Sequence, residues 1–441
     1  MEPHVPHNQV LPLSAKAKRT HEQPISYLIA TALRNPNLIN LAAGLVDPLT
    51  LPIEECAAIT RKLFSDAAVA RAALQYDTTL GLADLRRELH AHIAQLEDVS
   101  TSNLAYTPDQ ILVTTGSQQV LYLVGDVLVD PGDIVIAANP SYFVYTGTLA
   151  SLGATVMAVP MDEHGMDVDA VENLLARLER EGKLAKVKLI YCTTYFDNPT
   201  GLSLSVQRRQ KLLHLAQSYS KRHRILIHED AAYRELRYDG PAMPSIKSFD
   251  RDNQFVILSK TFSKPFAPGI KLGYSAMPDD LLHAVLQQKG NHDFGSANVC
   301  QYIALEAMRD GSYSKHAELL RKSYRPKRDA ILAALDRYMP KGNGITWTHP
   351  HGGLYVWLTL AENVDTSRRS RMFQNSVAAG VLYVPGDYCM SPTEAGEIPR
   401  NHLRLSFGQV APDQIEPGIE RLANVVTKEL SLEATGVPVT S

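Results

Sequence analysis

Cysteine is scarce in this 441-residue chain, and its four copies stand far apart with no Cys-x-x-Cys pair: Cys56, Cys192, Cys300 and Cys389. This spacing argues against a disulfide framework and against a zinc site, and it favours the reducing cytoplasm as the compartment. Long apolar runs are also missing, so we expect no membrane span. Residues 1–20 are polar and lack the apolar stretch of a signal peptide.

No charge of one sign dominates, because 44 Lys and Arg face 47 Asp and Glu and leave a net charge of -3. This balance predicts neither a nucleic-acid partner nor an anionic membrane surface as a partner. Hydrophobic residues make up 45% of the sequence. A chain of this length and composition exceeds a single small core, so we expect a large domain and a smaller one.

Short runs rich in Val, Ile and Leu alternate with stretches of helical periodicity. We expect strands at residues 111–114, 134–137, 154–159, 187–192, 225–228, 255–258 and 272–275, and helices at 118–128, 168–178 and 205–217. Strand, helix, strand in sequence requires crossover connections. The pattern therefore predicts an α/β fold whose central sheet is mostly parallel and covered by helices on both faces.

The pattern changes after about residue 300. Helices are expected at 301–308 and 315–338, where Pro326 should kink or split the second, and strands at 352–358 and 402–407. We expect a mobile arm at 1–24, a large domain at 61–310, and a smaller α+β domain built from 25–60 and 311–441. The tail after about Lys428 is weakly patterned.

Lys264 follows the expected strand at 255–258, and in an open parallel sheet ligands bind beyond the carboxyl ends of the strands. A lysine amine can bond covalently to an aldehyde cofactor. The hydroxyls of Thr261 and Ser263 and the charge of Lys271 would suit a phosphate group. Taken alone, the segment could equally be a surface loop with several lysines.

Asp230 ends another buried strand, and Tyr233 follows it three residues later. Such an aspartate can pair with the protonated nitrogen of a pyridine ring, which keeps the ring positive and makes it an electron sink. The phenol of Tyr233 could bond a hydroxyl on that ring. The alternative for Asp230 is an ordinary helix cap. His228 is expected to be a packed strand histidine.

Three further turns come directly after strands. Gly116-Ser117-Gln118-Gln119 opens a helix, whose free N–H groups are suited to a phosphate. Asn198-Pro199-Thr200-Gly201 offers an amide to a ring oxygen, or is a simple Asn-Pro turn. Tyr142 could stack on a flat ring, or pack in the core.

Arg404 lies within an apolar strand pattern and needs a partner there. A two-pronged grip on a substrate carboxylate would satisfy its guanidinium group. A buried structural salt bridge is the alternative.

Taken together and in order, these motifs resemble those of the class I/II aminotransferases, fold-type I enzymes that use pyridoxal 5'-phosphate (PLP), over roughly residues 25 to 425. The resemblance implies transfer of an amino group from an L-amino acid to a 2-oxo acid by a ping-pong mechanism. It implies that Lys264 holds PLP and moves the proton, Asp230 faces the ring nitrogen, and Tyr142 stacks on the ring. Asn198 and Tyr233 would bond the ring hydroxyl, and the phosphate would lie among Ser117, Gln118, Thr261, Ser263 and Lys271.

The resemblance also implies that Arg404 binds the substrate α-carboxylate and that the loop of Gly44 contacts substrate. Tyr76 matches a tyrosine that reaches the phosphate of the neighbouring subunit, which implies a homodimer with shared active sites. The stretch at 40–44 is similar to the 2-aminoadipate and aromatic branch of the family. One departure is Lys271, where the family usually has arginine, so PLP would be held less tightly.

Two alternatives remain open. The same fold could carry a PLP-dependent lyase or decarboxylase, because fold does not decide which bond at the substrate Cα breaks. Aminotransferase-like chains also serve as ligand sensors fused to DNA-binding domains, although the 24 residues that precede the fold are too few for a winged helix. Tyr383 and Tyr388 could line the substrate pocket or be packing residues.

Overall fold

An eight-stranded sheet forms the centre of the protein in a computed structural model that describes residues 11–22, 24–392 and 396–434. All pairings among β3, β4, β6, β7 and β8 are parallel, whereas β9 runs antiparallel to both β2 and β8. The mostly parallel sheet predicted from the sequence is confirmed, and the seven expected strands are present to within a few residues. In sheet order, the strands are β2 (Ile111–Thr114), β9 (Gly273–Ala276), β8 (Val256–Thr261), β7 (Leu226–Asp230), β6 (Val187–Thr193), β3 (Ile134–Asn139), β4 (Thr155–Asp162) and β5 (Gly165–Met166).

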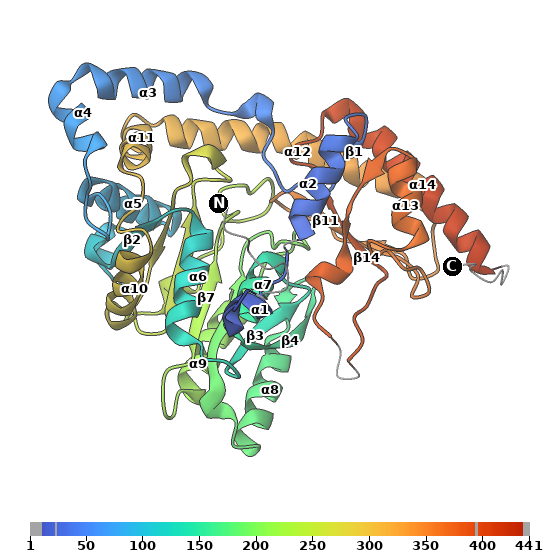
Figure 1. Cartoon of the computed structure of the whole chain (residues 1–441), viewed down its shortest axis with the longest axis horizontal. Helices are drawn as coiled ribbons and strands as arrows, with labels where there is room; N and C mark the ends of the chain where they lie inside the picture. Colours follow the sequence, from blue (N-terminus) through green and yellow to red (C-terminus); the bar gives the residue numbers. More distant parts are fainter. Residues whose placement is uncertain (1–10, 23, 393–395, 435–441) are drawn as a thin grey trace, which may run out of the picture.

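Helices cover both faces of this sheet (Figure 1). Neighbouring residues on a strand point to opposite faces, so Val135 packs under α6 (Ser117–Leu128), α7 (Phe143–Leu152) and α10 (Asp279–His292), while Ile136 packs under α8 (Val168–Arg180) and α9 (Val206–Tyr219). Burial on both faces explains why these strands read as continuous apolar runs.

A second, four-stranded sheet is antiparallel, in the order β10 (Thr346–Trp347), β11 (Tyr355–Thr359), β14 (His402–Ser406) and β13 (Val384–Pro385). Nearby, β1 (Ile39–Asn40) pairs in parallel with β12 (Val381–Leu382), so a segment early in the chain lies against a late one. Around them lie α2 (Pro24–Arg34), α13 (Arg371–Ala378) and α14 (Pro412–Ala434), which extends well past Lys428.

The long helix α12 (Ser312–Tyr338) runs across the upper part of the molecule, below α3 (Ile53–Ser65), in Figure 1. It continues through Pro326 as one helix, so the expected split does not occur. The remaining helices are α1 (Ala15–Arg19), α3 (Ile53–Ser65), α4 (Ala67–Leu74), α5 (Ala83–Leu96) and α11 (Asn298–Arg309). Short 3-10 helices occur at Pro48–Thr50, Thr101–Asn103, Pro108–Gln110, Leu184–Lys186, Lys247–Phe249, Pro268–Ile270 and Gly386–Cys389.

The expected arm, residues 1–24, lies only partly within the described residues. In its described part, Lys16 of α1 donates hydrogen bonds to Tyr122 (2.6 Å) and to Asp126 (2.9 Å) of α6. Arg19 donates to the carbonyl oxygen of Ser151 at the end of α7. This short helix is therefore bound to the helices that cover the central sheet.

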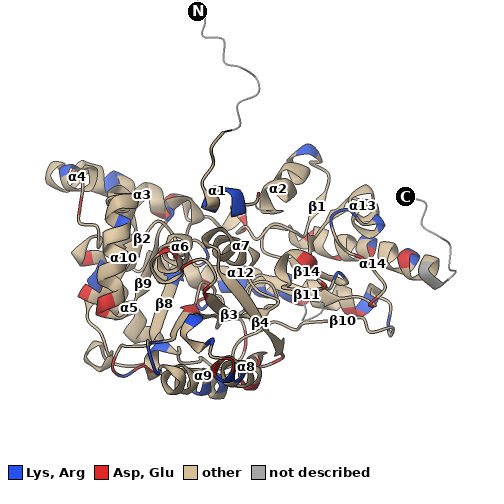
Figure 2. Ribbon diagram, turned by 60° about the horizontal axis from the view of Figure 1, so that its bottom comes forward, with Lys and Arg blue, Asp and Glu red and all other residues tan. Residues whose placement is uncertain are grey.

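Lys and Arg positions are interspersed with Asp and Glu positions along the described ribbon (Figure 2). Within residues 11–22, 24–392 and 396–434, no helix is long and apolar enough to cross a membrane. In the same part of the chain, no cluster of three or more His, Cys, Asp or Glu side chains could hold a metal ion. All four cysteines are free thiols.

Candidate active site

A cavity of about 190 Å³ opens beyond the carboxyl ends of β6, β7 and β8, where the N-terminus of α6 meets the sheet. Ten residues singled out from the sequence line it: Ser117, Gln118, Tyr142, Asn198, Asp230, Tyr233, Thr261, Ser263, Lys264 and Lys271. They come from five separate segments of the chain. Their convergence follows from the parallel sheet, which brings the carboxyl ends of its strands to one edge.

The Lys264 amine lies within this cavity, half-buried, three residues after β8. Its Nζ donates a 2.7 Å hydrogen bond to the carbonyl oxygen of Gly44 and lies 5.7 Å from the centre of the Tyr233 ring. Of the neighbouring lysines, Lys260 is buried in an ion pair with Glu235 on the opposite side of β8. Lys264 is thus held by one neutral carbonyl and is available to bond covalently to a ligand.

Asp230 lies at the base of the cavity, at the end of β7, and is buried. Its Oδ2 accepts a 3.1 Å hydrogen bond from the Tyr191 hydroxyl, and its Oδ1 accepts one from the Ala232 N–H at 3.1 Å. Burial raises the pKa of this carboxyl group to about 6, although both hydrogen bonds act to lower it. The second bond stabilises a turn, because residues 231–235 form no helix that Asp230 could cap, and no positive side chain neutralises this carboxylate among its described contacts. A cationic ligand group would do so.

The first turn of α6 presents free N–H groups to the cavity. Gly116 precedes the helix with φ of 74°, in the left-handed region that favours glycine, and no side chain caps the helix within the described structure. Gly273 at the start of β9 passes so close that an added Cβ would lie 2.4 Å from the Ser117 nitrogen. The hydroxyls of Thr261 and Ser263 and the Lys271 amine complete the lining. N–H groups, hydroxyls and a cation form a cup that suits a phosphate group.

Arg404 projects from β14 toward this site and is only 2% exposed. Its guanidinium group donates to Asn198 Oδ1 (2.7 Å) and to the Ala42 carbonyl oxygen (2.8 Å), while Nε has no partner among the described atoms. The described contacts contain no carboxylate, which argues against the structural salt bridge considered as the alternative. The positive charge is held by neutral groups and remains available to an anion.

Two tyrosines at the site escaped the sequence reasoning. The Tyr355 hydroxyl lies 3.0 Å from that of Tyr233, and the Tyr355 ring lies 4.4 Å from the Arg404 guanidinium. Tyr355 also fills the space beside Gly44, where a Cβ would lie 2.4 Å from the Tyr355 hydroxyl. Tyr191 was hidden because it reads as one more apolar strand residue, yet it hydrogen-bonds Asp230.

Asp197, next to Asn198, is a second buried carboxyl group that the sequence reasoning did not single out. Burial raises its pKa to about 7, and the nearby charge of Asp230 contributes in the same direction. Its Oδ2 accepts hydrogen bonds from the side chain and the N–H of Thr200, which shape the turn. Asp197 therefore orients the loop that carries Asn198.

Three tyrosines named from the sequence lie outside the cavity lining. Tyr76 is 81% exposed, and its ring meets that of Phe294 edge to face at 5.5 Å. Tyr383 is fully buried, with its hydroxyl bonded to the Thr366 carbonyl oxygen, and is a packing residue. Tyr388 is half-buried, 6.5 Å from Phe143. His228 is the packed strand histidine expected, bonded to Ser259 Oγ at 2.6 Å.

Comparison with known proteins decides the family. The family model described as aminotransferase class I and II matches residues 36–422. The chain belongs to this family. It is 36% identical over 394 residues to aromatic-amino-acid aminotransferase 1 of Thermococcus litoralis, with 89% of each chain covered. It is 30% identical to the 2-aminoadipate transaminase of Thermus thermophilus, over 90% of this chain and 92% of that one.

A solved structure of Pyrococcus horikoshii kynurenine aminotransferase, in complex with PMP, superposes with a TM-score of 0.85 at 33% identity, covering 95% of this chain and 97% of that one. The chain is accordingly a PLP-dependent aminotransferase. Its own residues fit the cofactor, because one cavity brings together the Lys264 amine, a buried carboxylate and a helix N-terminus, the last two without a counter-charge or cap among the described residues.

Proposed function

We propose that the cavity around Lys264 is the transamination site and that this lysine both holds PLP and moves the proton at the substrate Cα. The carrying observation is that the Lys264 amine, Asp230 and the free N-terminus of α6 line one cavity. Bound PLP supplies the electron sink for this chemistry. With PLP bound, Asp230 would keep the ring nitrogen protonated, Asn198 and Tyr233 would bond the ring hydroxyl, and Tyr142 would stack on the ring.

Lys264→Ala tests this assignment. We expect the variant to lose transamination between an amino acid and a 2-oxo acid, and we expect a small added amine such as methylamine to restore part of it, because the amine replaces the missing proton acceptor. Lys315→Ala, which removes an exposed lysine of α12, is the matched control and should keep full activity. Full transamination by Lys264→Ala without added amine would contradict the proposal.

Arg404 is proposed to bind the substrate α-carboxylate, beside the loop of Gly44. Its Nε, which has no partner among the described atoms, and its neutral partners, the Asn198 amide oxygen and the Ala42 carbonyl oxygen, support this role. Holding the carboxylate there sets the orientation of the Cα–H bond toward the Lys264 amine. In Arg404→Lys the charge remains, but the paired N–H groups that can bind both oxygens of a carboxylate are lost, so we expect KM for the amino donor to rise about a hundredfold. An unchanged KM would contradict the assignment.

We propose aromatic L-amino acids as the amino donors. Rings surround the Arg404 guanidinium: Tyr355 lies 4.4 Å and Phe143 lies 5.8 Å from it, and Tyr388 lies beyond Phe143. An aromatic side chain would pack against these rings with offset or edge-to-face contacts. A panel of donors tests this, with kcat/KM expected to be highest for phenylalanine, tyrosine or kynurenine.

A second candidate donor has an acidic side chain, as 2-aminoadipate does. Arg368 lies over the Tyr27 ring of α2 at 3.3 Å, and its charge acts to lower the pKa of the nearby Tyr388 hydroxyl, so a cation is present at the far end of the aromatic cluster. Arg368→Gln separates the two candidates. It should lower kcat/KM for 2-aminoadipate and leave that for phenylalanine unchanged if both donors are used.

We propose that the chain works as a homodimer in which Tyr76 reaches the PLP phosphate of the partner. Support comes from large apolar side chains that are exposed along this part of the chain, before and at the start of α3, at the end of α4 and at the turn before α11, where Phe294 contacts Tyr76: Leu49, Ile53, Leu74 and Phe294. Such a surface is usually an interface in a protein of this size.

The free thiols, two of them partly exposed, support a cytoplasmic location.

Hybrid dimers test the shared site. Lys264→Ala alone should be inactive and Tyr76→Phe alone should be weakened. Equal mixing after unfolding and refolding should recover about a quarter of the wild-type activity, since each hybrid contains one intact site. If each chain builds its whole site, no such recovery occurs. A monomer of full activity by light scattering would also contradict the proposal.

The chain is proposed to divide into a large domain, residues 61–310, and a small domain built from 25–60 and 311–441. The parallel pairing of β1 with β12 supports joining the early segment to the late one. The cavity then lies where both domains contribute, because Arg404 and Gly44 belong to the small domain and Lys264 to the large one.

A further inference from the structure

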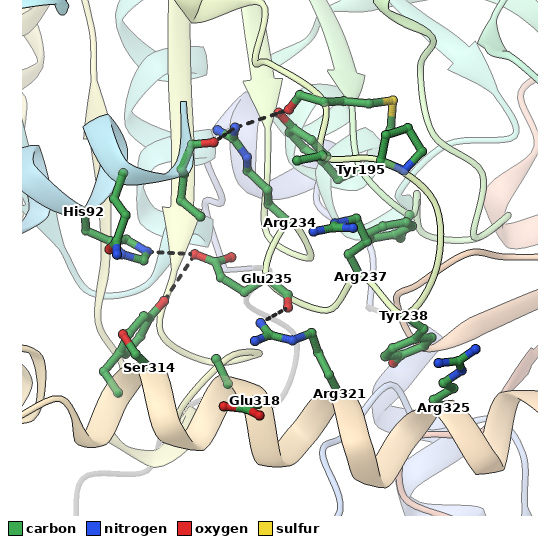
Figure 3. Close-up of a pocket in the computed structure, with 18 of the residues that line it drawn as sticks. His92, Tyr195, Arg234, Glu235, Arg237, Tyr238, Ser314, Glu318, Arg321 and Arg325 are labelled. Carbon is green, nitrogen blue, oxygen red and sulfur yellow. Dashed lines mark hydrogen bonds and ion pairs between the residues drawn. The ribbon is translucent and has the colours of Figure 1, made fainter. Parts of the chain in front are cut away.

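A second, larger cavity of about 610 Å³ is lined by residues that directly follow Tyr233 in the chain (Figure 3). It is bounded by the end of α5, by the segment 234–243 that follows β7, and by the first half of α12. Among the described residues, the two cavities share no lining residue, although Tyr233 lines one and Arg234 and Glu235 line the other. The mechanism proposed above does not use this second cavity.

Positive charge exceeds negative charge in the lining, with five cations against two carboxylates: Arg234, Arg237, Arg321, Lys322 and Arg325 against Glu235 and Glu318. Three of the cations are neutralised by ion pairs. Arg234 pairs with Glu97, Lys322 with Glu318 at 2.7 Å, and Arg325 with Asp239 at 2.8 Å. The remaining two cations, Arg237 and Arg321, form no ion pair among the described residues.

Arg237 and Arg321 have no carboxylate partner in the part of the chain that the structure describes. Arg237 Nη1 donates to the carbonyl oxygen of Gly240, and Arg321 Nη1 donates to that of Glu235 at 3.2 Å. The two side chains come from opposite walls and extend into the same space (Figure 3). Each guanidinium group keeps further N–H donors for an anion.

We propose that this cavity is a binding site for a small phosphate-bearing ligand, separate from the PLP site. Two guanidinium groups that lack a carboxylate partner among the described residues suit a group that carries two negative charges and several acceptor oxygens, as a phosphate or a phosphate monoester does. The cavity is larger than a phosphate group, so an organic remainder would lie against the half-buried Tyr238 and the neighbouring wall.

Occupation of this cavity would join two parts of the protein. Arg237 belongs to the segment that directly follows Asp230 and Tyr233, whereas Arg321 belongs to α12. The same segment is hydrogen-bonded to the loop before β11, since Gly353 N–H donates to the Leu236 carbonyl oxygen at 2.9 Å and Tyr238 N–H donates to that of His351 at 2.8 Å. A ligand held by both arginines would therefore stiffen the connection between the central sheet and the loop that leads to Tyr355.

Calorimetric titration of the PLP-loaded protein with inorganic phosphate tests the proposal. PLP occupies the phosphate cup in this form, and its absorption shows that it stays bound. We expect one phosphate per chain to bind, and we expect Arg237→Gln and Arg321→Gln each to weaken binding by at least about tenfold. Arg180→Gln at the end of α8, an exposed arginine outside the lining of this cavity, is the matched control and should bind as the wild type does.

The two substitutions lie on different walls of the cavity, so one variant still tests the proposal if the other fails to fold. Thermal unfolding shows whether each variant is folded. Absence of phosphate binding to the wild type would overturn the proposal. So would equal binding by both variants and the wild type, or tighter binding of succinate than of phosphate at equal ionic strength, because the site would then recognise carboxylates or nothing.

Discussion

Replacing Asp230 with asparagine should stabilise the PLP-free protein at alkaline pH and weaken its hold on PLP. In the folded protein, burial raises the pKa of this carboxyl group from 3.8 to about 6. The protonated form is therefore favoured by folding. The stability that protonated Asp230 contributes is complete below pH 3.8 and is lost as the pH rises through about 6. At pH 8 the ionised carboxylate therefore lowers the free energy of unfolding by about 3 kcal/mol relative to the protonated form.

In Asp230→Asn the new side chain carries no charge at any of these pH values. Its single carbonyl oxygen can accept from only one of the two present donors, the Tyr191 hydroxyl and the Ala232 N–H, which costs about 1 kcal/mol. We expect a net gain of about 2 kcal/mol in the free energy of unfolding of the PLP-free variant at pH 8. At pH 4 the gain from removing the charge should vanish, and only the loss of about 1 kcal/mol from the missing hydrogen bond should remain.

Urea unfolding of the PLP-free protein at both pH values measures this difference. Asp252→Asn, which removes an exposed carboxyl group, is the matched control and should behave as the wild type does at each pH. In the PLP-loaded protein the sign reverses, because the ring cation stabilises the Asp230 carboxylate and the variant loses that partner. A gain that is equal at pH 4 and pH 8, or no gain at pH 8, would refute the reasoning.

Three further substitutions probe the phosphate cup and the packing beneath it. Lys271→Arg should retain PLP more tightly in equilibrium dialysis, by up to about tenfold, because a fork replaces a point charge; an unchanged affinity would show that Lys271 does not contact the phosphate. Gly273→Ala should weaken PLP binding at least tenfold, by roughly 1.4 kcal/mol or more, since its Cβ would lie 2.4 Å from the Ser117 nitrogen, and normal binding would contradict the close approach. Tyr145→Phe should raise the free energy of unfolding, measured in urea, by about 1 kcal/mol, because the buried Tyr145 hydroxyl has no hydrogen-bond partner within the described residues; a destabilised variant would reveal a partner.

Much of the central sheet could be predicted because its strands are short, apolar and separated by turns. Residues that follow such strands necessarily gather at one edge, so Lys264, Asp230 and Asn198 could be predicted as neighbours from position alone. The direction of β9 could not be predicted, because an apolar run reads the same in both directions.

Contacts between segments far apart in the sequence could not be predicted. Tyr355 lies 122 positions from Tyr233 in the chain and reads as an ordinary strand residue, yet their hydroxyls meet. The hydrogen bond from Lys264 to the Gly44 carbonyl oxygen involves a backbone atom, which carries no sequence signal. The continuity of α12 through Pro326 was also hidden, because tertiary packing overrides the local cost of a helical proline.

The central claim is that Lys264 and its neighbours transfer an amino group. The most direct measurement is a single half-reaction, in which PLP-loaded protein is mixed with phenylalanine and no 2-oxo acid. We predict conversion of the bound cofactor to its amine form, seen as a change in its absorption, with one equivalent of phenylpyruvate per active site. Release of ammonia or carbon dioxide in place of that product, or an identical conversion by Lys264→Ala, would contradict the account.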